Sequence, residues 1–301
     1  MSAVVDLLAG GVTMAVPVLV AASGELVSER TGILNLSLEG MVLTSAFAAV
    51  YGSGQTDSPV LGTLCGVLAG LVFAGGQAVL SVTVRANQMI VGIAANTLAL
   101  GITSYGSRVL LGDAQGRTVP GFQPLKVPLL HDIPVLRQSG LAYVALALVV
   151  VLGVLGSRRT GLGLALDAVG ADAAVADQAG LPVRAVRYGA VLTTGLMAGL
   201  AGAQLALSEV HAFTDNMTSG LGYLAIVAVI AGRWRMVPMM LACLFFGVAQ
   251  ALQFTAPAMG VNLPVAILVV SPYLIALLAV SGLAGRSRAP AALAVPFVRK
   301  G

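Results

Sequence analysis

Polar side chains alternate with leucines in the segment SERTGILNLSLEG, residues 28–40. Asn35, Ser37 and Glu39 recur there with a period of two, although the flanking stretches are almost free of polar groups. An extended segment cannot lie exposed at membrane depth, because its backbone groups would lack hydrogen-bond partners. These residues therefore either begin a helix, with Asn35 and Glu39 one turn apart, or form irregular backbone that lines a polar cavity.

Glu39 is the one ionisable side chain among the three alternating polar residues. A carboxylate inside an apolar bundle costs about 2.5–3.5 kcal/mol even on lenient insertion scales, so it needs a role. One role is structural: Glu39 caps the helix expected over 40–51, where the helix dipole favours an anion, or locks the bundle. The other is direct contact with a passing solute. The sequence leaves both open.

Amides form a second cluster in ANQMIVGIAANTLALG, residues 86–101. Such side chains usually bridge neighbouring helices, and contact with a solute is the alternative role. Together they are neutral donors and acceptors, which suit an uncharged polar solute better than an ion or a phosphate. The residues that we expect to line or brace a substrate pathway are Asn35, Glu39, Asn87, Asn96 and Gln250.

Several function classes have no support in the sequence. It contains no G-x-x-x-x-G-K-[ST] phosphate loop and no catalytic constellation, so we expect neither nucleotide hydrolysis nor another enzyme activity from this chain. With only His131 and His211 and no Cys/His cluster, we expect no metal and no cofactor. The net charge of +4 comes from scattered basic residues, which anchor a membrane protein better than they bind nucleic acid.

The composition predicts a polytopic membrane protein. Hydrophobic residues make up 58% of the 301 residues and charged residues only 9%, whereas a soluble domain carries about 25% charged residues. From Met236 to Gly285 the chain contains no Asp, Glu, Lys or Arg. The N-terminus lacks a basic region and a cleavage site, so we expect a first membrane helix and no removed signal.

The apolar runs lack strand periodicity and predict an all-α fold with about 8–10 transmembrane helices. Two of them, 39–51 and 221–232, would be only about 20 Å long as helices. Each is preceded in the sequence by a polar or glycine-containing segment. Paired short segments of this kind often mark discontinuous helices around a pathway. The alternative is that each is an ordinary continuous helix, tilted or longer than its apolar run, whose ends the sequence does not mark clearly. The candidate spans are 6–22, 39–51, 60–84, 88–111, 141–156, 188–207, 221–232, 236–254 and 263–282.

Arginines in short loops place the C-terminus and the connection 157–187 in the cytoplasm and the N-terminus outside. The connection 112–140 disagrees, because it would be external yet holds Arg117, Lys126 and Arg137. We divide the chain into a transmembrane domain, 1–285, with a cytoplasmic coupling loop at 160–185, and a loose basic cytoplasmic tail, 286–301.

The connection 157–187 is long for a simple link between two spans. Residues 165–179 predict an amphipathic helix that ends at Gly180 and Pro182. An ordinary solvated connection is one interpretation, and a docking element for a cytoplasmic partner is the other. The run GLMAGLAGA, residues 195–203, predicts close helix packing through its small residues.

Three blocks carry a family resemblance: GELVSERTGILNLSLEGMVLTSAFAAV, RANQMIVGIAANTLALGITSY, and TGLGLALDAVGADAAVADQAGLPVRAVRYGAVLTTGLMAGLAGA. They resemble ABC-importer permeases of the branched-chain amino acid and simple-sugar superfamily. The resemblance is greatest to the branch that imports nucleosides together with a basic-membrane-protein lipoprotein. GYLAIVAVIAGRW is similar to the re-entrant segment of that family.

The resemblance implies a type II-like half-transporter in a bacterial inner membrane. Its expected partners are a cytosolic ABC ATPase, a second, non-identical permease subunit, an external substrate-binding lipoprotein and the lipid bilayer. It implies that the ATPase docks on the loop centred at Ala174–Gly180, through Asp167, Gly170, Ala174, Ala176, Asp177 and Gly180. Leu166 and Asp167 depart from the Arg-Ala-type pair of many relatives, which affects the polarity expected of that contact.

The resemblance and the neutral amides together predict ATP-driven import of nucleosides or related nucleobase-like solutes. A simple sugar or a riboflavin-like heterocycle is the alternative within the same machinery. An ion-coupled secondary transporter is the rival from another class, and it would require buried ionisable pairs that the sequence does not indicate.

Overall fold

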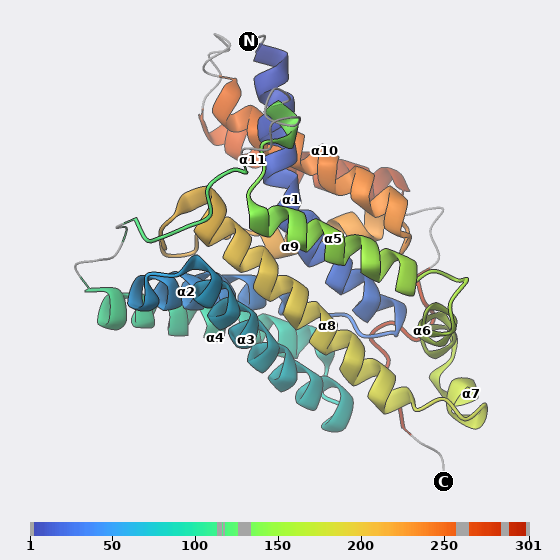
Figure 1. Ribbon diagram of the computed structural model, residues 1–301. Coiled ribbons are helices and arrows are strands. Elements are labelled where there is room, and N and C mark those ends of the chain that lie inside the picture. The colour runs from blue at the N-terminus through green and yellow to red at the C-terminus, as the bar shows by residue number, and fades with distance from the viewer. Residues whose placement is uncertain are drawn as a thin grey trace.

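The computed structural model describes residues 3–112, 116, 118–125, 134–256, 265–283 and 289–298. This described part is helical and contains no strand beyond one isolated bridge between Pro124 and Ser139. Figure 1 shows long helices packed against one another, with two short helices, α6 (Gly161–Ala171) and α7 (Ala173–Gln178), beyond the ends of α5 (Gly140–Leu155) and α8 (Val183–Gln204). Arg117 and Lys126 lie outside the described residues, so the external placement of the connection 112–140 stays a prediction.

Eleven α-helices form the described bundle. They are α1 (Ala3–Arg30), α2 (Leu38–Thr56), α3 (Pro59–Ala78), α4 (Gln88–Gly106), α5 (Gly140–Leu155), α6 (Gly161–Ala171), α7 (Ala173–Gln178), α8 (Val183–Gln204), α9 (Leu221–Ala231), α10 (Met236–Thr255) and α11 (Val265–Leu283). Short π-helical turns extend α3, α4 and α8, at Val79–Thr83, Ser107–Leu111 and Leu205–Val210.

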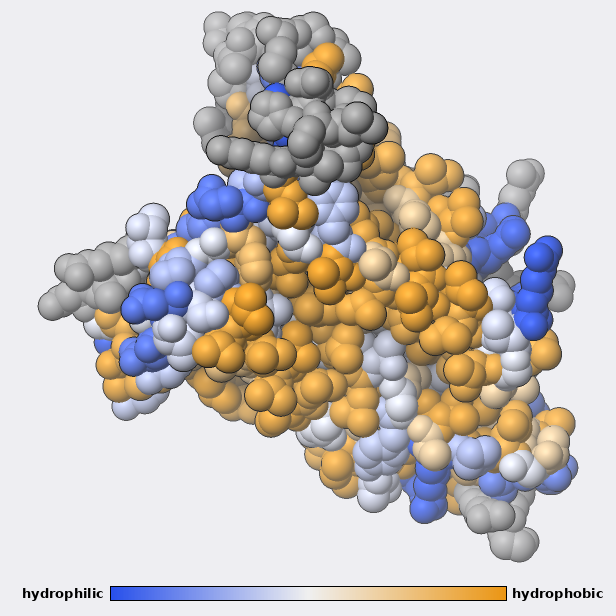
Figure 2. Space-filling model, viewed as in Figure 1, coloured by the Kyte–Doolittle hydropathy of each residue, from blue (hydrophilic) through white to orange (hydrophobic). Residues whose placement is uncertain are grey.

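Within the described residues, five continuous helical segments are long and apolar enough to cross a membrane: Val5–Arg30, Pro59–Thr83, Gln88–Leu111, Val183–Val210 and Met236–Thr255. The face drawn in Figure 2 is correspondingly hydrophobic over its centre, and hydrophilic residues gather at its edges. Such a distribution fits a protein whose apolar belt meets lipid and whose polar ends meet water.

Each candidate span overlaps a helix, but two predicted boundaries were wrong. The first helix does not stop near residue 22, because it continues through the polar residues up to Arg30. Those polar side chains are buried inside the bundle and have protein partners, so they need not leave the membrane. The second helix has 19 residues and ends at Thr56, so it is not short. The short helix over 221–231 is confirmed.

The core is built around α2 and α8, which are largely enclosed by α1, α3 and α9. α8 lies along α3: Figure 1 shows the two helices side by side, and many of their residues are in contact. A Cβ atom on Gly199 would lie 2.6 Å from Cα of Val67 on α3. The predicted close packing of the segment 195–203 is thereby confirmed.

The coupling loop differs from its prediction in one respect. Residues 165–179 do not form one helix, because the chain breaks at Asp172 between α6 and α7. The Asp172 carboxylate accepts hydrogen bonds from the backbone N–H groups of Ala174 and Val175 at 2.8 and 3.1 Å, and so caps α7. The predicted end at Gly180 is confirmed, since this residue has φ of +87° directly after α7.

The tail is not loose over residues 289–298, contrary to the prediction. The N–H of Ala292 donates to the carbonyl of Gly170 at 2.9 Å, and the N–H of Ala294 donates to the carbonyl of Gly32 at 2.9 Å. Phe297 packs against the small apolar cluster that joins α6, α7 and the start of α8. The tail therefore connects α6 and α7 to the turn after α1.

Replacing Gly199 by Ala should lower the stability of the protein, because the added methyl group would collide with α3. We expect a loss of about 1–3 kcal/mol, as for other overpacked sites. Gly189 lies on the same helix with open space around its Cα, so Gly189→Ala is the matched control. That control should gain up to about 1 kcal/mol of helix propensity. Melting temperatures in detergent that rank the two variants in the opposite order would contradict this packing.

Candidate functional site

The irregular turn between α1 and α2 is held by side chains from other parts of the bundle. The N–H of Asn35 donates to Oε1 of Glu25 at 3.0 Å, and the N–H of Leu34 donates to Oε1 of Gln88 at 2.8 Å. Glu25, Asn35 and Gln88 are all buried. These contacts supply the partners that the turn's backbone would otherwise lack at this depth.

Asn96 of α4 completes the start of α2. Its Oδ1 accepts a hydrogen bond from the N–H of Gly40 at 2.8 Å. Its Nδ2 donates to the carbonyl of Leu36 and to the hydroxyl of Tyr223, each at 2.8 Å. One amide therefore caps α2 and connects it to α9. This is the bridging role that the sequence offered as the more ordinary one for such amides.

Glu39 caps a helix, but not its own. Oε1 accepts hydrogen bonds from the hydroxyl of Thr218 at 2.6 Å and from the N–H of Gly220 at 2.8 Å. Oε2 accepts from the N–H of Gly222 at 2.6 Å. The carboxylate thus lies at the N-terminus of α9, where the helix dipole favours negative charge. Of the roles that the sequence left open, these contacts agree with locking the bundle, because Glu39 joins α2 to α9, whereas Asn96 accepts the hydrogen bond at the start of α2.

The starts of α2 and α9 consequently meet in close contact. A Cβ atom on Gly222 would lie 2.5 Å from the backbone nitrogen of Glu39, so only glycine allows this approach. Asn35 belongs to the same junction and is fully buried, with its Oδ1 accepting from the hydroxyl of Ser37 at 2.6 Å. The structure therefore brings Asn35, Glu39 and Asn96 together.

Two predicted pathway residues lie elsewhere. Asn87 is exposed and caps α4, accepting hydrogen bonds from the N–H groups of Met89 and Ile90 at 3.0 and 3.3 Å. Gln250 is half-buried on α10, which packs mainly against α1. Neither residue joins the junction between α2 and α9.

Sequence reasoning missed two tyrosines beside the junction. Tyr223 is 45% exposed, and Tyr273 is 38% exposed and donates to the carbonyl of Ser219. Their only sequence signal is an isolated aromatic in an apolar run, which is common in any membrane helix. They leave aromatic surface open next to the start of α9.

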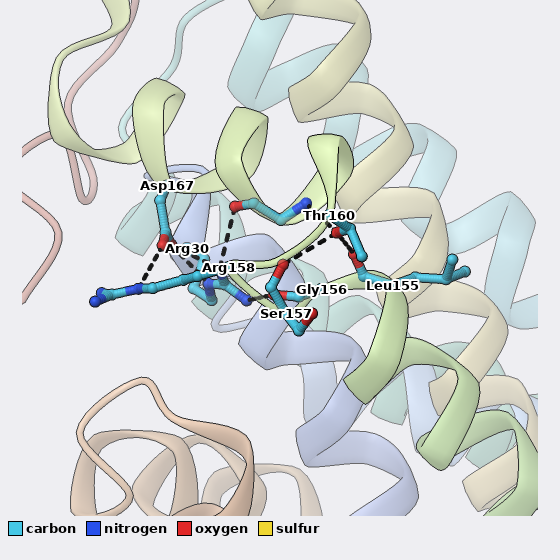
Figure 3. Close-up of polar contacts among 8 residues, drawn as sticks. Arg30, Leu155, Gly156, Ser157, Arg158, Thr160 and Asp167 are labelled. Carbon is cyan, nitrogen blue, oxygen red and sulfur yellow. Dashed lines mark hydrogen bonds and ion pairs between the residues drawn. The ribbon is translucent and has the colours of Figure 1, made fainter.

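A second polar cluster ties α1 to the coupling loop (Figure 3). The guanidinium of Arg30 contacts Asp167 at 2.9 and 2.7 Å and donates to the carbonyl of Gly156 at 2.5 Å. Arg158 contacts the other carboxylate oxygen of Asp167 at 2.9 Å. Figure 3 shows Arg30 beneath α6, with Arg158 extending outward from Asp167. Asp167 therefore faces arginines of its own chain, which accounts for an acidic residue at this position.

The remaining predicted coupling residues divide by exposure. Gly170 and Ala176 are buried, and the backbone of Gly170 lies against the carbonyl of Arg30 and the tail. Ala174 and Gly180 are exposed on α7 and at its end. Asp177 is half-buried on the same short helix, and its carbonyl accepts from the N–H of Gly180 at 3.0 Å.

The sequence was compared with protein families and with curated proteins. Residues 7–278 match the model of a family described as the permease component of the branched-chain amino acid transport system. The chain belongs to this family. It is therefore a multi-pass membrane permease, and the predicted superfamily is confirmed.

Several curated relatives are named as ABC transporter permeases. The chain is 33% identical to the guanosine ABC transporter permease protein NupQ of Bacillus subtilis (strain 168), over 95% of this chain and 94% of the relative. It is 29% identical to the nucleoside ABC transporter permease protein NupC of Lactococcus lactis subsp. cremoris (strain MG1363), over 94% and 93%. It is 34% identical to a putative glucose ABC transporter permease protein, TsgC13, of Haloferax volcanii, over 87% and 81%.

Replacing Glu39 by Gln should loosen the start of α9. The amide nitrogen cannot accept hydrogen bonds, and hydrogen bonds to charged groups are worth about 1.5–3 kcal/mol each. We expect Glu39→Gln to lower the melting temperature more than Thr218→Val, which removes one of the three donors. Thermal unfolding of the two purified variants checks this ranking. A Glu39→Gln protein as stable as the wild type would show that the cap is unimportant.

Proposed function

We propose that the chain is the permease subunit of an ATP-driven importer of nucleosides in a bacterial plasma membrane. The observation that carries this proposal is its identity of 33% with the guanosine permease NupQ over nearly the whole of both chains. The nucleoside permease NupC, which matches over a similar length, supports the same substrate class.

The junction between α2 and α9 is the part of the pathway that this chain contributes. Asn35, Glu39 and Asn96 brace it from inside, because their polar atoms are occupied by backbone and side-chain partners. Tyr223 and Tyr273 form its exposed wall. An aromatic face stacks on a nucleobase irrespective of the base, and neutral hydroxyls and carbonyls suit the ribose.

A second permease subunit would complete this wall. The chain also matches the guanosine permease NupP of Bacillus subtilis (strain 168), at 29% identity over 72% of its length. NupP and NupQ are two permeases named for guanosine in one organism, which supports a heterodimer here. An external binding lipoprotein would deliver the solute to the dimer.

The ATPase would dock on α7 and its exposed neighbours, around Ala174 and Gly180. Motion of α6 would then reach the end of α1 through the contact between Asp167 and Arg30. Arg30 is the last residue of α1, directly before the turn that leads into α2. The proposed motor and the proposed pathway are thus connected by one short segment of backbone.

Glucose is the second candidate substrate, because the putative glucose permease TsgC13 is 34% identical over 87% of the chain. Sugars also stack on aromatic rings and use neutral hydrogen-bonding groups. A transport measurement separates the two substrates.

Guanosine should accumulate in proteoliposomes that contain the complete transporter, only when ATP is present on the ATPase side. Unlabelled nucleosides should compete and glucose should not. Tyr223→Ala should lower uptake about tenfold, because stacking on one ring is worth about 1–3 kcal/mol. Tyr223→Phe keeps the ring and should retain most of the uptake. Competition by glucose but not by nucleosides would favour the second candidate, and uptake that follows a proton gradient without ATP would contradict the proposal.

Replacing Gly180 by Pro should abolish association with the ATPase while leaving membrane insertion intact. The N–H of Gly180 donates to the carbonyl of Asp177, and φ of +87° is not available to proline. Asn tolerates this conformation, so Gly180→Asn is the matched control and should still bind. Co-purification of the ATPase with each tagged variant measures the effect. Normal recovery with Gly180→Pro would contradict the docking site.

A further inference from the structure

A cavity of about 310 Å³ lies between α1, α5 and α10, at the end of the bundle that carries α6. We call it the α5–α10 pocket. Its lining comes from the last two turns of α1, the end of α5 and the loop that follows, and the start of α10 with the loop before it. The junction of α2 and α9 does not use this space, which borders the contact between Arg30 and Asp167.

Arginines surround the mouth of the α5–α10 pocket. Arg30, Arg158 and Arg235 line it. Arg30 is occupied, because its guanidinium contacts Asp167 and two backbone carbonyls. The side chain of Arg158 is 82% exposed and meets Asp167 through Nε alone in the described structure, and Arg235 is also exposed. Both residues thus hold guanidinium groups at the opening, available to an anion.

The loop that carries Arg235 is fixed in place. Arg233 and Trp234 have φ of 55° and 56°, a left-handed conformation that is unfavourable for non-glycine residues. The indole N–H of Trp234 donates to the buried carboxylate of Glu29 at 2.5 Å and holds this turn against α1. Arg235 is therefore positioned at the mouth by a strained, anchored loop.

The inner wall of the pocket is apolar. Leu26 and Val27 of α1, Leu152 of α5, and Met236 and Val237 of α10 line it. These residues belong to the apolar helices, and Val237 is 67% exposed. Figure 2 shows continuous hydrophobic surface over the region of α5 and α10, ending in hydrophilic residues at the right edge. Positive charge thus adjoins a hydrophobic groove at one rim of the membrane belt.

We propose that the α5–α10 pocket binds an anionic phospholipid. The phosphate of its headgroup lies between Arg158 and Arg235, and an acyl chain follows the groove along α5 and α10. Basic pockets between helices at the cytoplasmic side bind such headgroups, and each basic residue near the surface adds to the attraction. This inference does not depend on the transported solute.

The apolar wall distinguishes a lipid from other anions. A free phosphate would gain nothing from Leu152 or Val237, whereas the acyl chain of a lipid packs against these apolar side chains. An acidic peptide of a soluble subunit would cover the arginines but would leave the groove along α10 open. The combination of charge and apolar depth therefore favours the lipid.

The test is native mass spectrometry of the full-length permease with its transporter subunits, exposed to equal amounts of phosphatidylglycerol and phosphatidylcholine with the same chains. We expect the wild type to retain phosphatidylglycerol about tenfold over phosphatidylcholine, a factor that corresponds to 1.4 kcal/mol. The double variant Arg158→Gln, Arg235→Gln should bind the two lipids nearly equally. Size-exclusion profiles confirm that each variant is folded.

Arg159→Gln is the matched control, because Arg159 is exposed, adjacent in sequence and outside the pocket lining. It should keep the wild-type preference. Equal retention of both lipids by the wild type, or an equal loss in Arg159→Gln, would overturn the proposal. Displacement of the lipid by glycerol phosphate at equal concentration would make this a free-anion site. Loss of the ATPase from the double variant with an unchanged lipid preference would assign the pocket to that subunit instead.

Discussion

A bilayer offers no water to an unpaired backbone group, and this constraint governs the centre of the protein. Two irregular segments, 31–37 and 211–220, lead into α2 and α9. Side chains from elsewhere in the chain accept hydrogen bonds from N–H groups of these segments and of the first turns that follow them. Gln88 and Glu25 accept from the turn before α2, Asn96 accepts from Gly40 at the start of α2, and Glu39 accepts from Gly220 and Gly222 at the start of α9. The polar residues that look misplaced in an apolar sequence are therefore the ones that make interrupted helices possible at this depth.

The same residues connect parts of the molecule that are far apart in sequence. Asn96 joins α4 to the starts of both α2 and α9, and Glu39 holds α9 from α2. On the other side of the turn, Arg30 contacts Asp167 of α6. A displacement of α6 would have a direct physical route to the junction, through one ion pair and one short turn. This arrangement suits a permease driven by an external motor.

Local sequence predicted most of the helices but not the partners of the polar residues. Apolar runs and helix-ending signals such as Gly180 are encoded within a few residues, so the corresponding elements were predicted well. Glu39 caps a helix that begins more than a hundred residues later, and no local pattern encodes that pairing. The extension of α1 to Arg30 depends on burial of Glu25 and Glu29 by the rest of the bundle, and a hydropathy profile cannot register it. The packed tail was missed for the same reason.

The central claim is that Glu39 supplies the missing partners of the α9 N-terminus. Hydrogen exchange of the Gly220 and Gly222 amides, compared between the wild type and Glu39→Gln in lipid nanodiscs, tests it most directly. The account predicts slow exchange at both amides in the wild type and much faster exchange in the variant, with little change along α3. Equal exchange rates at these two amides in both proteins would contradict it.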